Sequence, residues 1–154
     1  MESKKSVYKV LIVSVIIVAF IAGVLLYLRP MELSDLVNED QQILITWNEI
    51  GIRNGEPYID SESYNDVTEE QKLNMIELFQ QYTYKRSLAT PFSDGSLSEL
   101  GEELIYVFVY EDSELVSSVC ISDVDAMSVN DRTYVVRNAS GLIQDILHLS
   151  LIHI

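Results

Sequence analysis

The stretch that decides the fold is residues 104–110, Leu-Ile-Tyr-Val-Phe-Val-Tyr. In an extended strand its odd-numbered aliphatic residues would point to one side, and Tyr106, Phe108 and Tyr110 would point to the other. A strand that is apolar on both faces is usually covered on both, so we expect it at the centre of a sheet. The periodicity around it is also that of strands.

Toward the C-terminus, short apolar runs alternate with polar turns. A turn at 111–114 leads into a second strand, on which Leu115, Val119 and Ile121 would share one face. Further strands are expected at 126–129 and 132–137, joined by a turn at Asn130-Asp131, and this pattern predicts an antiparallel meander. A short helix capped by Ser140 should follow, because its apolar residues recur at helical spacing.

Toward the N-terminus, residues 43–47 are rich in residues that favour strands, and Asn54-Gly55 between two apolar runs is a strong hairpin signal. Thr68 and Gln71 have the spacing of a capping box, which predicts a helix that ends near Arg86. A loop is expected over 92–101. The order of strand or hairpin, helix, three to four antiparallel strands and helix predicts a two-layer α+β domain.

An uncharged apolar stretch of 19 residues, Val10 to Leu28, precedes this domain. As a helix it would be about 28 Å long, close to the thickness of the bilayer hydrocarbon core. A cleaved signal peptide is the alternative, but its apolar region is usually shorter and ends in a small-x-small site that is missing here. We therefore expect an uncleaved transmembrane helix at 10–28.

The net charge of the chain changes sign across this apolar stretch. Residues 1–29 carry four cations and one acid, a net charge of +3, whereas residues 30–154 carry six cations and 23 acids, a net charge of −17. The lysines before the span predict a cytoplasmic N-terminus and a domain outside the cell membrane. The acidic balance disfavours nucleic-acid binding.

The expected organisation has five parts. A cytoplasmic basic tail at 1–9 precedes the transmembrane helix at 10–28, a stalk at 29–42 and an extracytoplasmic domain at 43–148. The last six residues, 149–154, resemble the translation of the transposase end used in preparing sequencing libraries. This resemblance implies that the natural chain was interrupted near His148; the alternative is a genuine helix end.

Catalytic and metal-binding motifs are missing from the sequence. There is no serine, zinc, phosphate-loop or paired-cysteine signature, so we expect no enzyme, no cofactor and no identifiable small-molecule substrate. Cys120 is a lone cysteine and is expected to be a small buried side chain. Asp123, Asp125 and Asp131 could gather around calcium, but solvated turns explain them better.

Tyrosines are the candidate binding residues. Tyr106 and Tyr110 lie on the aromatic side of the central strand, and Tyr82 and Tyr84 are expected near the end of the first domain helix. An open tyrosine-rich patch would suit a protein partner, because tyrosine supplies contact area and a polar tip. The alternative is that the hairpin at 43–60 or a helix covers these rings.

The whole layout of basic start, single span and small acidic domain resembles uncharacterised single-pass membrane proteins of Gram-positive bacteria. The resemblance implies a regulatory, accessory or immunity-like role and transfers no site residues. We therefore expect a membrane-anchored interaction or regulatory module. The alternatives are an accessory subunit of a larger membrane complex, packed through Ser14, Ala19, Ala22 and Gly23, and, third, an enzyme.

Overall fold

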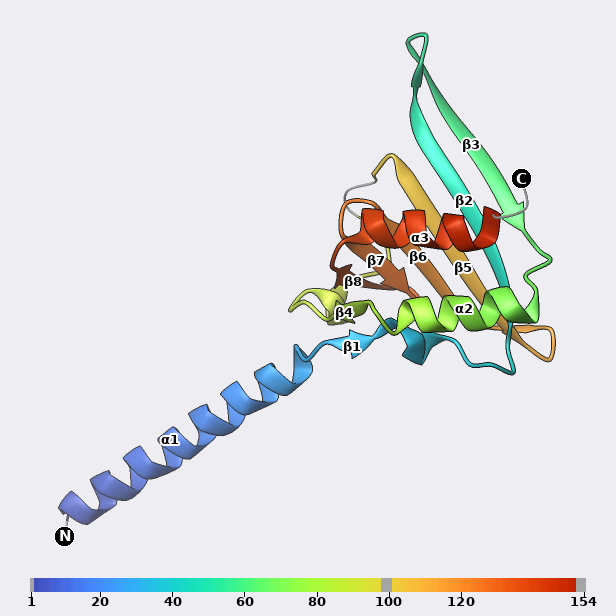
Figure 1. The fold of residues 1–154 in the computed structure, drawn as a ribbon. Helices are drawn as coiled ribbons and strands as arrows, with labels where there is room; N and C mark the ends of the chain where they lie inside the picture. The colour runs from blue at the N-terminus through green and yellow to red at the C-terminus, as the bar shows by residue number, and fades with distance from the viewer. Residues whose placement is uncertain (1, 98–100, 152–154) are drawn as a thin grey trace.

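An antiparallel sheet of eight strands forms the centre of the computed structural model, which describes residues 2–97 and 101–151. The strands lie in the order β1-β4-β8-β7-β6-β5-β2-β3 (Figure 1). Their bounds are β1 (Met31–Glu32), β2 (Gln42–Arg53), β3 (Glu56–Tyr64), β4 (Thr83–Lys85), β5 (Glu103–Glu111), β6 (Glu114–Ser122), β7 (Ala126–Val129) and β8 (Arg132–Val136). The predicted α+β class and the antiparallel meander are confirmed.

Strand β5 occupies the central position that its sequence predicts, between β2 and β6. Its aliphatic residues Ile105, Val107 and Val109 are completely buried. A bulge at Val109/Tyr110 shifts the pairing, so that Tyr110 lies opposite Leu115 and Val109 opposite Ser117. Leu115 therefore lies on the face of Tyr110 rather than with Val119 and Ile121, because a bulge inserts one extra residue and reverses the alternation beyond it.

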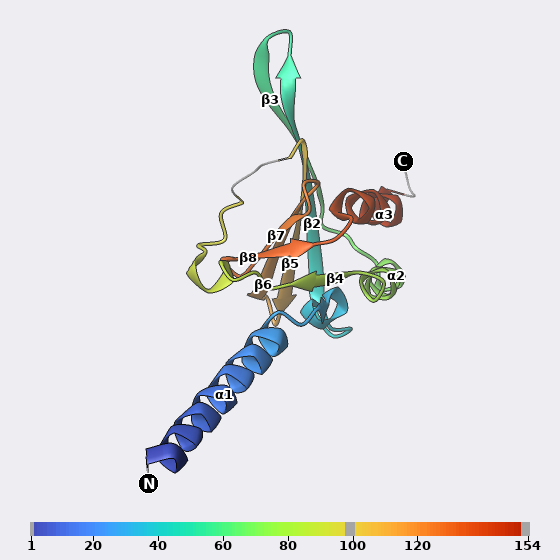
Figure 2. The same cartoon turned by 90° about the vertical axis from the view of Figure 1, so that its left-hand side faces the viewer.

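Two helices, α2 (Glu69–Phe79) and α3 (Ala139–Leu151), cover one face of the sheet (Figures 1 and 2). Their buried apolar side chains pack on the aliphatic residues of the strands and form one core with them. We call this the covered face. The opposite face, to which Tyr106, Phe108 and Tyr110 point, is called the open face.

Three tight hairpin turns have positive φ at both central residues, as in type I′ turns. They are Asn54-Gly55, Asp112-Ser113 and Asn130-Asp131. Asparagine, aspartate and glycine tolerate this backbone region better than other residues, which explains why these turns could be predicted.

The first domain helix is shorter than predicted. The capping box of Thr68 and Gln71 is present, but α2 ends at Phe79 and not near Arg86. Residues 83–85 form β4 instead, where Tyr84 pairs with Val136 of β8. The prediction failed because the apolar spacing continues past Phe79, whereas pairing with a distant strand decides the conformation there.

The start of α3 also differs from the prediction. The helix begins at Ala139, before Ser140, and the backbone N–H of Ala139 donates to the Asp125 carboxylate at 2.8 Å. A carboxylate from the β6–β7 turn thus satisfies the helix N-terminus. Residues 149–151, predicted as a foreign tail, continue α3, and 152–154 lie outside the described residues.

The segment 29–42, predicted as a stalk, is partly built into the domain. Besides β1 it forms the short 3₁₀ helix η1 (Leu33–Leu36), and Leu33 and Val37 are buried in the core. The buried ammonium group of Lys72 donates to the backbone carbonyls of Glu39 and Gln41. A cation from α2 therefore holds a polar run that was expected to lie free in water.

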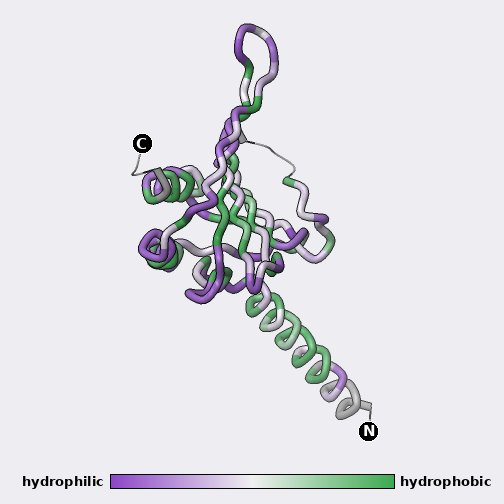
Figure 3. Tube along the Cα trace, turned by 90° about the vertical axis from the view of Figure 1, so that its right-hand side faces the viewer, coloured by the Kyte–Doolittle hydropathy of each residue, from purple (hydrophilic) through white to green (hydrophobic). Residues whose placement is uncertain are grey.

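Helix α1 (Glu2–Tyr27) extends away from the sheet (Figure 1). Most of its length is hydrophobic (Figure 3), and its described apolar side chains from Leu11 to Leu26 are largely exposed. None of the helices in the described residues has both the length and the hydropathy of a membrane span.

Candidate interaction surface

The open face is built from matching rows of side chains across β2, β5 and β6. One row places Leu44 beside Phe108 and Ser118, and the next places Thr46 beside Tyr106 and Cys120. Directly paired residues of antiparallel strands point to the same side, so these rows form one continuous surface.

Tyr106, Phe108 and Tyr110 are all half-buried. The rings of Tyr106 and Phe108 lie almost parallel, with their centroids 6.1 Å apart. The face is therefore neither fully covered by a second layer nor fully exposed. The hairpin 43–60 does not fold over it, because β2 and β3 extend the same sheet sideways.

The other two candidate tyrosines lie elsewhere. Tyr84 is buried on the covered face and makes an edge-to-face contact with Tyr134, with ring centroids 5.2 Å apart. Tyr82 donates its hydroxyl to the Asp145 carboxylate of α3 at 2.8 Å, and burial followed by this bond raises its pKa to about 12. The four tyrosines therefore do not form one patch, and only Tyr106 and Tyr110 share a surface.

The hairpin of β2 and β3 extends well beyond its neighbours. Pairing of β2 with β5 ends at Glu49 and Glu103, so residues 50–59 project as a two-stranded ribbon, which we call the arm (Figure 1). It points away from α1 and lies at the other end of the domain (Figures 1 and 2).

The arm carries an apolar row on its open-face side. Ile50 pairs with Ile59, and Ile52 pairs with Pro57. Ile52 is 77% exposed and Ile59 is 67% exposed, although both are large aliphatic side chains. A cluster of exposed aliphatic residues at the end of a rigid element is typical of a contact surface.

The opposite side of the arm is polar and internally bonded. Tyr58 donates its hydroxyl to the Glu49 carboxylate at 2.6 Å, and the Arg53 guanidinium lies 4.2 Å from the centre of the Tyr58 ring. Arg53 also bonds to Asp60 at 3.1 Å. The Tyr58 ring lies over Gly51, where an added Cβ would come within 2.7 Å of it. These contacts stiffen the arm, so its apolar side is preformed.

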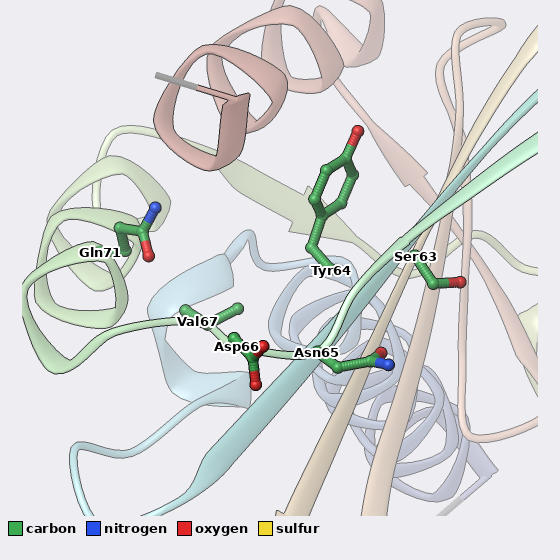
Figure 4. A pocket seen from close by; sticks show the side chains of 6 residues that line it. All are labelled: Ser63, Tyr64, Asn65, Asp66, Val67 and Gln71. Atoms are coloured by element: carbon green, nitrogen blue, oxygen red, sulfur yellow. The ribbon is translucent and has the colours of Figure 1, made fainter. Parts of the chain in front are cut away.

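A hollow of about 240 Å³ lies where β3 leads into α2 (Figure 4). Its lining includes Tyr64, Asp66 and Gln71, and the carboxamide of Gln71 is occupied in the capping box. Within residues 2–97 and 101–151 there is no group of three or more metal-ligating side chains. Asp66 is the single carboxylate among the residues that line the hollow.

Cys120 lies half-buried on the open face beside Tyr106. Burial raises the pKa of its thiol to about 11, against a smaller opposing effect of the Tyr106 hydroxyl. At neutral pH the thiol is therefore protonated, which does not suit a nucleophile.

The sequence did not single out the exposed residues of the arm. The Asn54-Gly55 signal located the turn, but the exposure of Ile52 and Ile59 depends on where the neighbouring strand β5 begins. A long hairpin with apolar residues on one side, followed by a shorter neighbouring strand, is the signal that could have found it. No family model, curated protein or solved structure matches the chain.

Proposed function

We propose that this chain is a membrane-anchored interaction or regulatory module that binds a protein partner outside the cytoplasm through the arm. The observation that carries the proposal is the apolar row on the arm, in which Ile52, Pro57 and Ile59 are exposed and Ile50 is half-buried. The row lies at the end of the domain remote from α1, where a partner can reach it without meeting the membrane (Figure 1).

The anchor itself is inferred from residues 10–28 and the exposure of α1. A helix with exposed Leu11, Ile16, Phe20 and Leu25 has apolar side chains around its whole circumference. In water such a helix would leave a large apolar surface unburied, whereas lipid would cover it. The lysines before residue 10 favour a cytoplasmic N-terminus.

The chemistry of the partner follows from the surroundings of the arm. The domain is strongly acidic, and Glu56 lies at the tip of the arm, on the side opposite the apolar row. A matching partner would present apolar area with a basic rim, because complementary charge speeds and orients association. The half-buried Tyr106 and Tyr110 could extend the contact along the open face.

The test compares partner capture by the full chain with capture by the double variant Ile52→Ser/Ile59→Ser, followed by binding measurements on the purified partner. We expect the variant to lose the partner and to keep the wild-type melting temperature, since both side chains are exposed. Leu73→Ser, an exposed apolar residue on α2, is the matched control and should bind normally. Unchanged capture by the double variant would exclude the arm.

A second comparison separates the proposal from the accessory-subunit alternative. Partners captured by the full chain but lost when only α1 is replaced by an unrelated span would indicate packing within the membrane. Partners retained after that replacement, and lost after Tyr106→Ser/Tyr110→Ser or the arm variant, would favour the external module. Reporter fusions after Asp40 test the orientation of the domain.

A further inference from the structure

The segment that follows β4, residues 86–93, has its polar and apolar side chains in an unusual arrangement. Thr90 is buried and donates its hydroxyl to the carbonyl of Thr133 at 2.7 Å, and the Ser93 hydroxyl accepts from the backbone N–H of Thr133 at 2.8 Å. Arg132 donates to the carbonyls of Pro91 and Ser93. Polar groups therefore fasten this segment to β8.

The apolar residues of the same segment point outward. Phe92 is 89% exposed, more than any described large apolar side chain of α1, and Leu88 is 68% exposed. Ala89 and Pro91 are exposed as well. In water, proteins normally bury apolar side chains and expose polar ones. This turn does the opposite, because its hydroxyl groups point inward and its apolar side chains point outward. We call residues 88–92 the apolar turn.

The apolar turn lies at the end of the domain where α1 enters it. Figures 1 and 2 both place the segment that carries η2 (Thr90–Phe92) near the C-terminal end of α1. The guanidinium group of Arg86 lies 5.4 Å from the centre of the Tyr27 ring, the last residue of that helix. The apolar turn is thus close to the level at which the proposed span leaves the membrane.

Cations gather at this end of an otherwise acidic domain. From residue 29 onward the chain has seven cations, and five of them are near the apolar turn or the end of α1: Arg29, Lys85, Arg86, Arg132 and Arg137. The two others, Arg53 and Lys72, are in ion pairs with acids, whereas none of the five forms an ion pair within the described residues. Acids such as Asp35, Asp94 and Asp125 also lie at this end, so it presents cations and acids side by side.

We propose that the apolar turn is a second membrane contact, which inserts Leu88 and Phe92 into the headgroup region of an anionic lipid surface beside α1. The inference rests on the proposed anchoring. Aromatic and aliphatic side chains favour that region, and neighbouring Lys and Arg residues are attracted to anionic headgroups. With two points of contact the domain is held in one orientation, and the arm points away from the membrane.

The experiment uses the full chain with Cys120→Ser and one environment-sensitive fluorophore on an introduced cysteine. The protein is reconstituted in vesicles of phosphatidylcholine and phosphatidylglycerol that contain spin-labelled lipid, which quenches fluorophores in contact with the bilayer. The label is placed at Ala89→Cys in the apolar turn, at Phe20→Cys in α1 or at Ile52→Cys on the arm. All three residues are exposed, so the labels do not disturb packing.

We expect quenching at positions 20 and 89 and none at 52. If the label at position 20 were quenched but the labels at positions 89 and 52 were both unquenched, the second membrane contact would be excluded and the anchor retained. Loss of quenching at 20 as well would overturn both proposals. Adding Leu88→Asp/Phe92→Asp should abolish quenching at 89 alone, and quenching retained in that variant would also contradict the inference.

The lipid charge provides the last arm of the experiment. In vesicles of phosphatidylcholine alone, or with Lys85→Glu, quenching at 89 should weaken, while that at 20 stays unchanged. The variant Glu77→Lys, which adds a cation on α2, is the control and should have no effect at 89. Equal quenching at 89 in neutral and anionic vesicles would remove the role given to the cations.

Discussion

The two ends of the domain expose apolar side chains for different structural reasons. On the arm, Ile52 and Ile59 are exposed because β2 and β3 continue beyond β5. Their side chains alternate between the two faces as in any strand, but no other part of the domain covers either face there. In the apolar turn, Phe92 is exposed because Thr90 and Ser93 turn their hydroxyl groups toward β8. The arm is an extension of the sheet, whereas the turn is held by hydrogen bonds to it.

This difference shows which contacts maintain each surface. The arm depends on backbone pairing and on the polar contacts around Tyr58, and the turn depends on hydroxyl and guanidinium groups. Neither surface adds to the core, so both should be open to change without unfolding the domain.

The largest expected effect comes from comparing two phenylalanines. Phe79 is 3% exposed in the core, and Phe79→Ala should cost about 3–5 kcal/mol of unfolding free energy through lost burial and the cavity left behind. Phe92→Ala should change it by about 0.5 kcal/mol or less, since that ring is exposed. Urea unfolding of the two variants measures both values, and similar losses would mean that Phe92 belongs to the core.

A smaller effect is expected at Thr90. Thr90→Val keeps the shape and removes a hydroxyl that donates to the Thr133 carbonyl and accepts from the Ser87 N–H, so about 1–3 kcal/mol should be lost. Amide hydrogen exchange should increase at residues 87–93 and not on the arm. Ser96→Ala, at an exposed position three residues beyond the segment, is the control. If amide exchange at residues 87–93 were the same in Thr90→Val as in the wild type, Thr90 would not hold the turn.

Gly51 tests the arm in the same way with a smaller expected loss. A Cβ there would come within 2.7 Å of the Tyr58 ring, so Gly51→Ala must displace the ring. Overpacking costs about 1–3 kcal/mol, and the lower entropy of the unfolded chain returns about 0.4–1 kcal/mol, which leaves a net loss of about 1 kcal/mol. Thermal unfolding measures the loss, and Gly51→Ala should cause no further loss when it is added to the single variant Tyr58→Ser.

Local patterns predicted the centre of the fold well. The alternation of residues 104–110 placed β5 between two neighbours, and Asn54-Gly55 and Asn130-Asp131 marked two turns, because these signals depend only on adjacent residues. The capping box of Thr68 and Gln71 located the start of α2 for the same reason. Such features are independent of what the rest of the chain does.

Features that depend on distant residues could not be predicted. The apolar helical spacing continues to Tyr82, yet residues 83–85 form β4 because β8, about 50 residues later, offers them a partner. The buried Lys72 brings residues 39 and 41 into the domain, which no local pattern indicates.

The candidate site was predicted in part for a related reason. Strand alternation correctly put Tyr106 and Tyr110 on one face, but Tyr84 points into the core. The exposure of the arm was missed because it depends on the length of a different strand, and the apolar turn because its hydroxyl partners lie on β8.

The smallest expected effect is a pH dependence of local opening that should occur in the arm and not in the apolar turn. A hydrogen bond to Glu49 raises the pKa of Tyr58 above its ordinary value of 10, with smaller contributions from burial and charge, while Arg53 opposes the shift. Because the folded pKa lies above the unfolded one, this contact stabilises the arm fully below pH 10 and is lost as the pH rises through the raised value. Tyr58 lies half-buried on a two-stranded ribbon outside the core, so the change should be local and too small to see in global unfolding. Amide exchange at Gly51 should therefore rise between pH 9 and pH 11 beyond the intrinsic increase of unfolded peptide, while exchange at Ser93 follows the intrinsic rate alone. Tyr58→Phe should show the faster arm exchange already at pH 9 and no further excess at pH 11. If the excess appeared equally at Ser93, the arm and the apolar turn would open together and could not be separate structural units.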